Sequence, residues 1–120
     1  MIKYMLPDKT VVDYDTFIND CTSIILHYIN ICHDKECGAE ILLSCSMTST
    51  DTYITIRMAE IRRTNHYYFD NIITDHYRLV NVYKTNADKY IPTDGDIRFN
   101  LKQAILLARQ DGAWYGTYNN

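Results

Sequence analysis

The side chains of this sequence that suit a chemical function are arginines set among aromatic residues. Guanidinium groups form paired hydrogen bonds with phosphate oxygens, and aromatic rings stack on nucleobases. Arg57 lies in a segment that alternates apolar and polar residues, and Arg109 lies five residues before Trp114. We predict that these two arginines hold a phosphate group. A second explanation for Arg109 is that its charge complements the dipole at the end of a helix.

Catalytic signatures are absent from the sequence. Hydrolysis or group transfer needs a nucleophile, a base or a metal, each with a supporting partner. The chain has no zinc-protease, nucleophile-elbow or glycine-rich phosphate-loop motif, and it has only four glycines. Cys45 and His76 are a cysteine and a histidine that a fold could pair, but nothing in the sequence singles them out. The sequence favours a binding protein over an enzyme.

The four cysteines indicate free thiols in a reducing compartment. They are separated by 11, 5 and 8 residues with no Cys-x-x-Cys pair, so buried thiols are favoured over a metal site at Cys32, His33 and Cys37. No apolar run reaches about 18 residues, and the N-terminus lacks a signal-peptide pattern. We expect a cytoplasmic protein with no membrane segment, metal or cofactor.

The chain length indicates a single domain, and the net charge limits the kinds of molecule that the protein can bind. A chain of 120 residues with 47% hydrophobic and 22% charged residues is typical of one globular domain, which we assign to residues 1–120. The net charge is −3, so no overall positive field attracts long nucleic acid or an anionic membrane. Tyrosine is unusually frequent, with 11 residues. An anion site must therefore come from the local placement of arginines.

Two helices are expected to position the candidate residues. Apolar residues recur at three- and four-residue spacing from Tyr14 to Cys32, with Asp13 as N-cap and Gly38 as a stop. A second helix is predicted from about Asp96 to Gln110, after a capping box that begins at Thr93 and before Gly112.

The remaining segments predict β-structure. A short hairpin opens the chain, with strands at 2–6 and 10–12 around a turn at 7–9. Residues that alternate at period two then predict an antiparallel meander of four strands, at 41–47, 53–63, 66–69 and 77–84. The predicted fold is α+β, a two-layer sandwich in which both helices cover one face of the sheet.

Period-two alternation also predicts what the uncovered face of that sheet carries. If Ile54, Ile56, Met58, Val80 and Val82 face the helices, a polar and aromatic set lies on the other face: Ser44, Ser46, Tyr53, Thr55, Arg57, Asn81 and Tyr83. Rings, hydroxyls and a guanidinium suit a nucleotide, and they also make an ordinary half-exposed sheet surface. Both interpretations remain open at this point.

Two apolar features predict self-association. Ile24, Leu26 and Ile31 widen the apolar stripe of the first helix beyond what one sheet covers. The segment 113–118 carries Trp114 and two tyrosines, and we expect it to pack on the domain or on a neighbour.

The predicted order of elements, the arginines Arg57 and Arg109, and the aromatic segment around Trp114 together resemble the first-described family of phage anti-Thoeris proteins. Those proteins bind, without cleaving it, the cyclic ADP-ribose signal made by TIR-domain defence enzymes, and members are also associated with cyclic oligonucleotides at a separate site. The resemblance implies ligand contacts by Arg57, Arg109, Phe99, Tyr83 and Trp114. It also implies a dimer or larger assembly, acting in the cytoplasm of the infected host cell.

A second class of function stays open from the residues. A protein-binding inhibitor, similar to anti-CRISPR proteins, would use the tyrosine-rich face as its binding surface, since tyrosine offers a large contact area with few rotatable bonds. The two functions predict different effects of substituting Arg57. A protein interface tolerates Arg57→Lys better than a bidentate phosphate site does.

Overall fold

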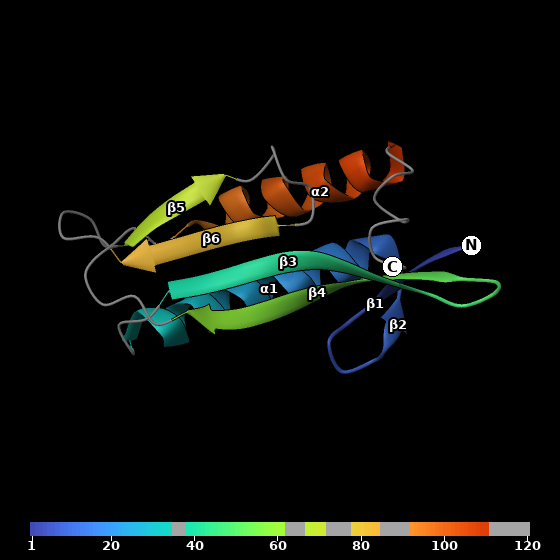
Figure 1. The fold of residues 1–120 in the computed structure, drawn as a ribbon, viewed down its shortest axis with the longest axis horizontal. Helices are drawn as coiled ribbons and strands as arrows, with labels where there is room; N and C mark the ends of the chain where they lie inside the picture. Colours follow the sequence, from blue (N-terminus) through green and yellow to red (C-terminus); the bar gives the residue numbers. More distant parts are fainter. Residues whose placement is uncertain (35–37, 62–66, 72–77, 85–91, 111–120) are drawn as a thin grey trace.

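The computed structural model of this protein describes residues 1–34, 38–61, 67–71, 78–84 and 92–110. Figure 1 shows its strands and its two helices, coloured along the chain. The elements are, in order, β1 (Ile2–Met5), β2 (Val11–Val12), α1 (Tyr14–Asp34), β3 (Gly38–Met47), β4 (Thr52–Ile61), β5 (Tyr67–Asn71), β6 (Arg78–Lys84) and α2 (Asp94–Gln110).

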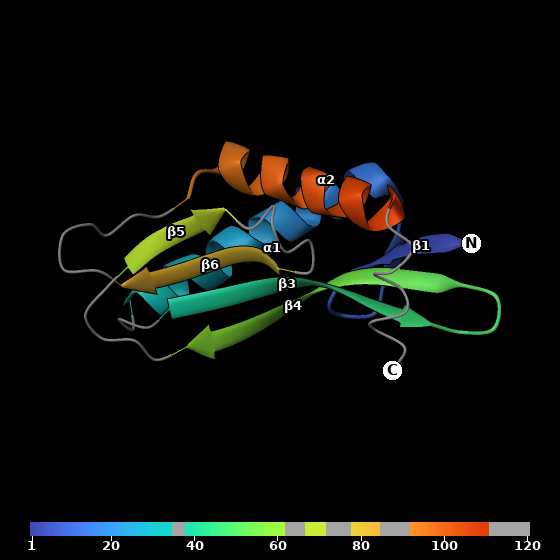
Figure 2. The same ribbon diagram turned by 45° about the horizontal axis from the view of Figure 1, so that its top comes forward.

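The strands form one sheet in the order β2-β1-β4-β3-β6-β5. Strands β3 and β4 pair antiparallel along their whole length, from Gly38 opposite Ile61 to Met47 opposite Thr52. Strand β6 is antiparallel to both β3 and β5, whereas β1 runs parallel to β4. Figure 2 shows β5 and β6 continuing the sheet beside β3 and β4. The described sheet is therefore mixed and mostly antiparallel.

The order of the strands corrects the predicted meander. A meander would place β5 next to β4, but β1 occupies that edge of β4, and β6 pairs with β3 instead. Two hairpins, β3–β4 and β5–β6, are thus joined side by side through β3 and β6. Alternation along a strand determines which residues share a face, but it carries no information about the lateral neighbours of that strand.

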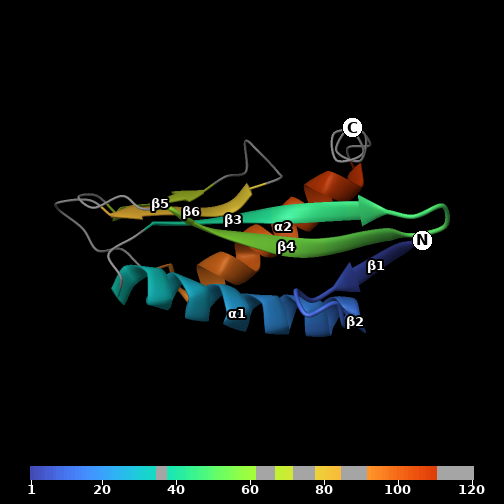
Figure 3. The ribbon, with the colours of Figure 1, turned by 60° about the horizontal axis from the view of Figure 1, so that its bottom comes forward.

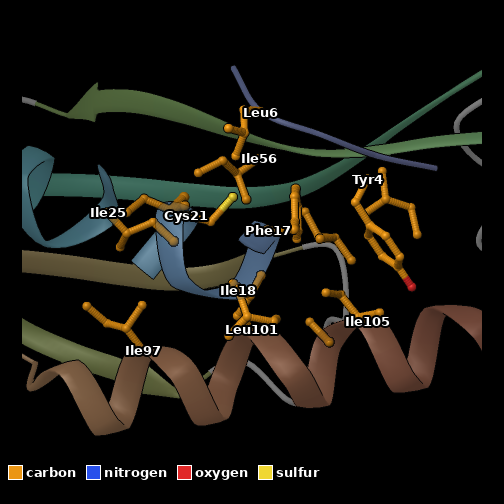
Figure 4. Close-up of a cluster of buried hydrophobic side chains, with 14 of the residues drawn as sticks. Tyr4, Leu6, Phe17, Ile18, Cys21, Ile25, Ile56, Ile97, Leu101 and Ile105 are labelled. Carbon is orange, nitrogen blue, oxygen red and sulfur yellow. The ribbon is translucent and has the colours of Figure 1, made fainter. Parts of the chain in front are cut away.

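One core cluster joins the sheet to both helices and confirms the α+β class. Helix α1 lies along one face of the sheet, and the buried residues of α2 belong to the same cluster (Figures 3 and 4). Ile41 and Leu43 of β3 lie opposite Met58 and Ile56 of β4, and all four pack in or against the core. The fully buried large side chains are Phe17, Ile25, Ile29, Ile41, Leu43, Ile54, Ile97, Leu101 and Ile105.

Both helices begin at side-chain caps that the sequence predicted. The Thr16 amide donates to Oδ1 of Asp13 at 2.7 Å, and the Phe17 amide donates to the Asp13 carbonyl at 2.9 Å. At α2 the Asp96 amide donates to Thr93 Oγ1 and the Thr93 amide to Asp96 Oδ2, both at 3.1 Å, which is the reciprocal arrangement of a capping box. Helix α1 ends at Asp34, before the predicted stop at Gly38, which instead opens β3.

The Asp13 cap predicts a dependence of stability on pH. The hydrogen bonds from the Thr16 backbone, and then from its side chain, lower the pKa of the Asp13 carboxyl below its ordinary value. A carboxyl with a lowered pKa stabilises the fold above its unfolded pKa, and this contribution is lost as pH falls through the folded pKa. We expect Asp13→Ala to flatten the decline of unfolding free energy between about pH 5 and pH 2 in acid titrations followed by denaturant unfolding.

Two variants control this measurement. Asp13→Asn keeps an oxygen that caps α1 but does not titrate, so it should match the wild type near neutral pH and lose less stability in acid. Asp15→Ala removes a carboxylate from the same helical turn without removing the cap. If Asp15→Ala flattens the acid decline as much as Asp13→Ala does, general charge in the first turn is responsible rather than the cap.

Candidate functional site

Arg109 lies against a cluster of aromatic residues. It is the last but one residue of α2, and its Nη1 donates a part-buried hydrogen bond to the Tyr4 hydroxyl at 3.2 Å. The ring of Tyr4 lies 5.3 Å from the ring of Tyr14, edge to face, and 5.3 Å from the ring of Phe17, tilted. Figure 4 shows the Tyr4 oxygen directed toward α2. We call Tyr4, Tyr14, Phe17 and Arg109 the Tyr4 cluster.

Three elements build the Tyr4 cluster, β1 and α1 near the start of the chain and α2 far from them in sequence. Strand β1 places Tyr4 beside Ile54 of β4 and Val12 of β2, and period-two alternation turns Tyr4 toward the helices. Tyr14 opens α1 and Phe17 follows it by three residues, so both rings lie on the same side of the helix. The last turn of α2 adds Arg109, whose charge also complements the helix dipole there.

The Tyr4 cluster carries one positive charge, that of Arg109, beside phenol groups. Burial raises the pKa of the Tyr14 phenol, Tyr4 adds to this effect, and Arg109 opposes it. Tyr14 is therefore a neutral hydrogen-bond donor at neutral pH. The ion pairs found among the described residues are Lys3 with Asp51 and Arg98 with Asp94, so within these ranges no carboxylate neutralises Arg109. A guanidinium beside a phenol donor is suited to a phosphate group.

Arg57 lies on the other side of the sheet. It is exposed on β4, between Ile56, which is buried, and Met58, which packs against the core. Across the strand pair, Leu42 lies opposite Arg57, Ser44 opposite Thr55, and Ser46 opposite Tyr53. We call these six residues the open face. For the residues of β3 and β4 with described side chains, the predicted assignment to two faces is confirmed.

The open face holds an unsatisfied polar atom. Oγ1 of Thr55 is shielded from solvent and has no hydrogen-bond partner within the described part of the chain. A buried hydroxyl without a partner costs about 1–3 kcal/mol of stability. Because solvent does not reach this oxygen, a ligand on the open face could bond to it only if the side chains around Thr55 moved.

The structure does not bring all the predicted site residues together. Arg57 is on the open face and Arg109 is on the helix side, so the sheet separates them within one copy of the chain. Phe99 is 52% exposed on α2, ten residues and about 15 Å of helix from Arg109. The backbone of Tyr83 pairs with Tyr68 in the β5–β6 hairpin, and its side chain is not described. Trp114 lies outside the described residues.

Tyr4 and Tyr14 are the site residues that sequence reasoning missed. A signal for each was present, because Tyr4 alternates with Leu6 in the first strand and Tyr14 belongs to the apolar stripe of the first helix. Nothing in the sequence indicated that the end of the second helix would meet the first strand. That contact spans 105 positions of the chain.

The described chain also contains two cysteines outside the Tyr4 cluster. Cys21 and Cys32 are buried, and burial raises the pKa of the Cys21 thiol to about 12, so Cys21 carries no thiolate at neutral pH. Within the described ranges, no three histidine, cysteine or acidic side chains are grouped as a metal site requires. None of the described helices has the length and apolarity needed to span a membrane.

The apolar surface differs from the one expected for self-association. Ile24 and Leu26 pack partly against the core, so the domain itself explains much of the width of the stripe on α1, whereas Ile31 remains 37% exposed. Among the large apolar residues left exposed, Phe99 and Leu106 lie seven residues apart on α2. Seven residues are about two helical turns, so both side chains project from the same side of α2. This outer side of α2 is the better candidate for a contact between copies.

No family model, no curated protein and no solved structure matches this chain. We therefore base the functional proposal on the side chains of the Tyr4 cluster and the open face.

Proposed function

We propose that this protein binds and sequesters, without cleaving it, a cyclic nucleotide-derived signal of the cyclic ADP-ribose type, as a phage counter-defence protein in the host cytoplasm. The observation that carries the proposal is the Arg109 guanidinium held at the aromatic Tyr4 cluster. Cyclic oligonucleotide signals, which also carry phosphates and bases, are a second ligand of the same chemistry.

The described residues supply the contacts that such a ligand needs. The guanidinium of Arg109 pairs with phosphate oxygens, and the Tyr14 phenol donates a further hydrogen bond. Phe99 lies about 15 Å along α2 from Arg109, so its ring is left out of this set of contacts. Binding of this kind requires no proton transfer, cofactor or metal, so the ligand leaves the protein unchanged.

Titration calorimetry followed by mass analysis tests the proposal. Purified protein is titrated with cyclic ADP-ribose isomers and with cyclic di- and trinucleotides, and linear ADP-ribose serves as the control for ring closure. We expect one of the cyclic compounds to bind with a dissociation constant of about 1 μM or below, and heat denaturation to release it with unchanged mass. An altered mass would identify an enzyme, and absence of binding by every cyclic compound would refute the proposal.

A protein-binding inhibitor is the second candidate, and the open face favours it. Arg57 and Tyr53 lie on this surface, away from Arg109. A protein partner would cover that surface. If the cyclic compounds fail to bind, an Arg57→Lys variant that still inhibits its target would support this function.

We also expect the protein to self-associate, and two exposed residues make a matched test. Leu106 on α2 is 49% exposed and Val11 on β2 is 50% exposed. Leu106→Lys should shift the wild-type assembly toward the 14.1 kDa monomer in light scattering at micromolar concentration, whereas Val11→Lys should not. The half-buried Leu26 is less suitable, since Leu26→Asp would also disturb the core. A wild-type protein that is monomeric at this concentration would contradict the expectation.

A further inference from the structure

Tyr4 is held in place from several sides. Its strand β1 is hydrogen-bonded to β2 on one edge and to β4 on the other. The residue is 9% exposed, and its ring packs against both Tyr14 and Phe17. Because aromatic rings in a close-packed core have few alternative positions, the Tyr4 hydroxyl occupies a defined place at the edge of that core.

The hydroxyl of Tyr4 holds the guanidinium end of the long Arg109 side chain. It accepts a hydrogen bond from a single N–H of Arg109, and within the described part of the chain the other N–H donors of the guanidinium remain for a ligand. A free arginine loses rotamer entropy when it binds, and a guanidinium that is already oriented loses less. The oxygen of Tyr4 accepts in this contact, so its own proton remains available for donation to the same ligand.

We infer that Tyr4 is a positioning residue that holds the Arg109 guanidinium in the orientation that receives a phosphate or pyrophosphate group. This inference rests on the proposed function and names the part of the ligand that the Tyr4 cluster binds. Arg109 then acts as an oriented planar fork, and the phenols of Tyr4 and Tyr14 donate beside it. The raised pKa of Tyr14 keeps that second phenol protonated at neutral pH.

A double-mutant cycle separates positioning from a structural role. Tyr4→Phe removes the hydroxyl and keeps the ring that packs on Tyr14 and Phe17. We expect Tyr4→Phe to weaken binding of the cyclic ADP-ribose isomers and of inorganic pyrophosphate about five- to tenfold. The same change in the Arg109→Ala background should alter affinity by less than about twofold, because the group that it orients is gone.

Two further variants act as controls. Arg109→Lys keeps the positive charge and loses the fork, so it should weaken binding of pyrophosphate by about tenfold or more. Tyr53→Phe makes the same chemical change on the open face and should leave binding unchanged. The melting temperature of each variant shows whether the fold is retained.

The outcomes for the inference and for the proposed function are distinct. If Tyr4→Phe binds like the wild type, or loses the same factor in both backgrounds, the positioning role is refuted while sequestration stands. If pyrophosphate binds and depends on Tyr4 and Arg109 but no cyclic nucleotide does, the positioning role stands and the proposed function fails. If neither pyrophosphate nor any cyclic nucleotide binds the wild type, both are wrong.

Discussion

Phe17→Ala should lower the free energy of unfolding by about 3–5 kcal/mol, whereas Phe99→Ala should change it by less than about 0.5 kcal/mol. The two residues are of one type and differ in burial. Phe17 is 0% exposed in the first turn of α1 and contacts the ring of Tyr4, while Phe99 is 52% exposed on α2. A domain of this size is stable by about 5–15 kcal/mol in total, so the loss at Phe17 removes a large fraction of that stability.

Urea denaturation followed by far-ultraviolet circular dichroism measures both variants. Leu101→Ala is a useful third variant, because Leu101 is fully buried on α2 and is not part of the Tyr4 cluster. It should cost about 2–5 kcal/mol and leave ligand affinity near that of the wild type. Phe17→Ala should also weaken ligand binding, since it removes the packing behind Tyr4. Equal losses of stability for Phe17→Ala and Phe99→Ala would show that the placement of Phe17 in the core is wrong.

Much of this fold was predictable because local patterns dominate it. Asp13 and Thr93 cap helices where the sequence places them, since a capping bond joins residues only three positions apart. Alternation assigned Ile54 and Ile56 to the buried face and Arg57 to the exposed one, since successive strand residues point to opposite faces. Each of these assignments needs information from only a few neighbouring residues.

The lateral order of the strands was not predictable in the same way. Strand β1 pairs in parallel with β4, bringing Tyr4 beside Ile54, and β6 pairs with β3, so β5 lies at the edge of the sheet beside β6 and not between β4 and β6. Such contacts depend on loop closure and on packing across the whole chain, which a single sequence does not encode at any one position.

For the candidate site too, residue types could be read from the sequence, but contacts between distant residues could not. Arg57 and Arg109 were chosen for their type and their aromatic neighbours, and only the folded chain shows that the sheet lies between them. The contact of Arg109 with Tyr4 joins the two ends of the described chain. Sequence spacing therefore selected Arg109 as a candidate but did not indicate that it would contact Tyr4.

The separation of the two arginines leads to the second large expected effect. Arg109→Ala should weaken binding of the cyclic ADP-ribose-type ligand about ten- to a hundredfold, since a charge-assisted hydrogen bond contributes about 1.5–3 kcal/mol. Arg57→Ala should change the same affinity by less than about twofold, because Arg57 is exposed on the opposite side of the sheet. Titration calorimetry of both variants gives the two affinities together with the number of ligands bound per chain.

The stoichiometry decides what a different result would mean. If Arg57→Ala weakens binding as much as Arg109→Ala does, and one ligand is bound for every two chains, the ligand lies between copies and takes one arginine from each. If each substitution instead removes a different cyclic ligand, the two sides of the sheet are separate sites. If both variants bind like the wild type, the phosphate of the ligand contacts neither arginine, and the site assigned to the Tyr4 cluster is wrong even if sequestration itself is observed.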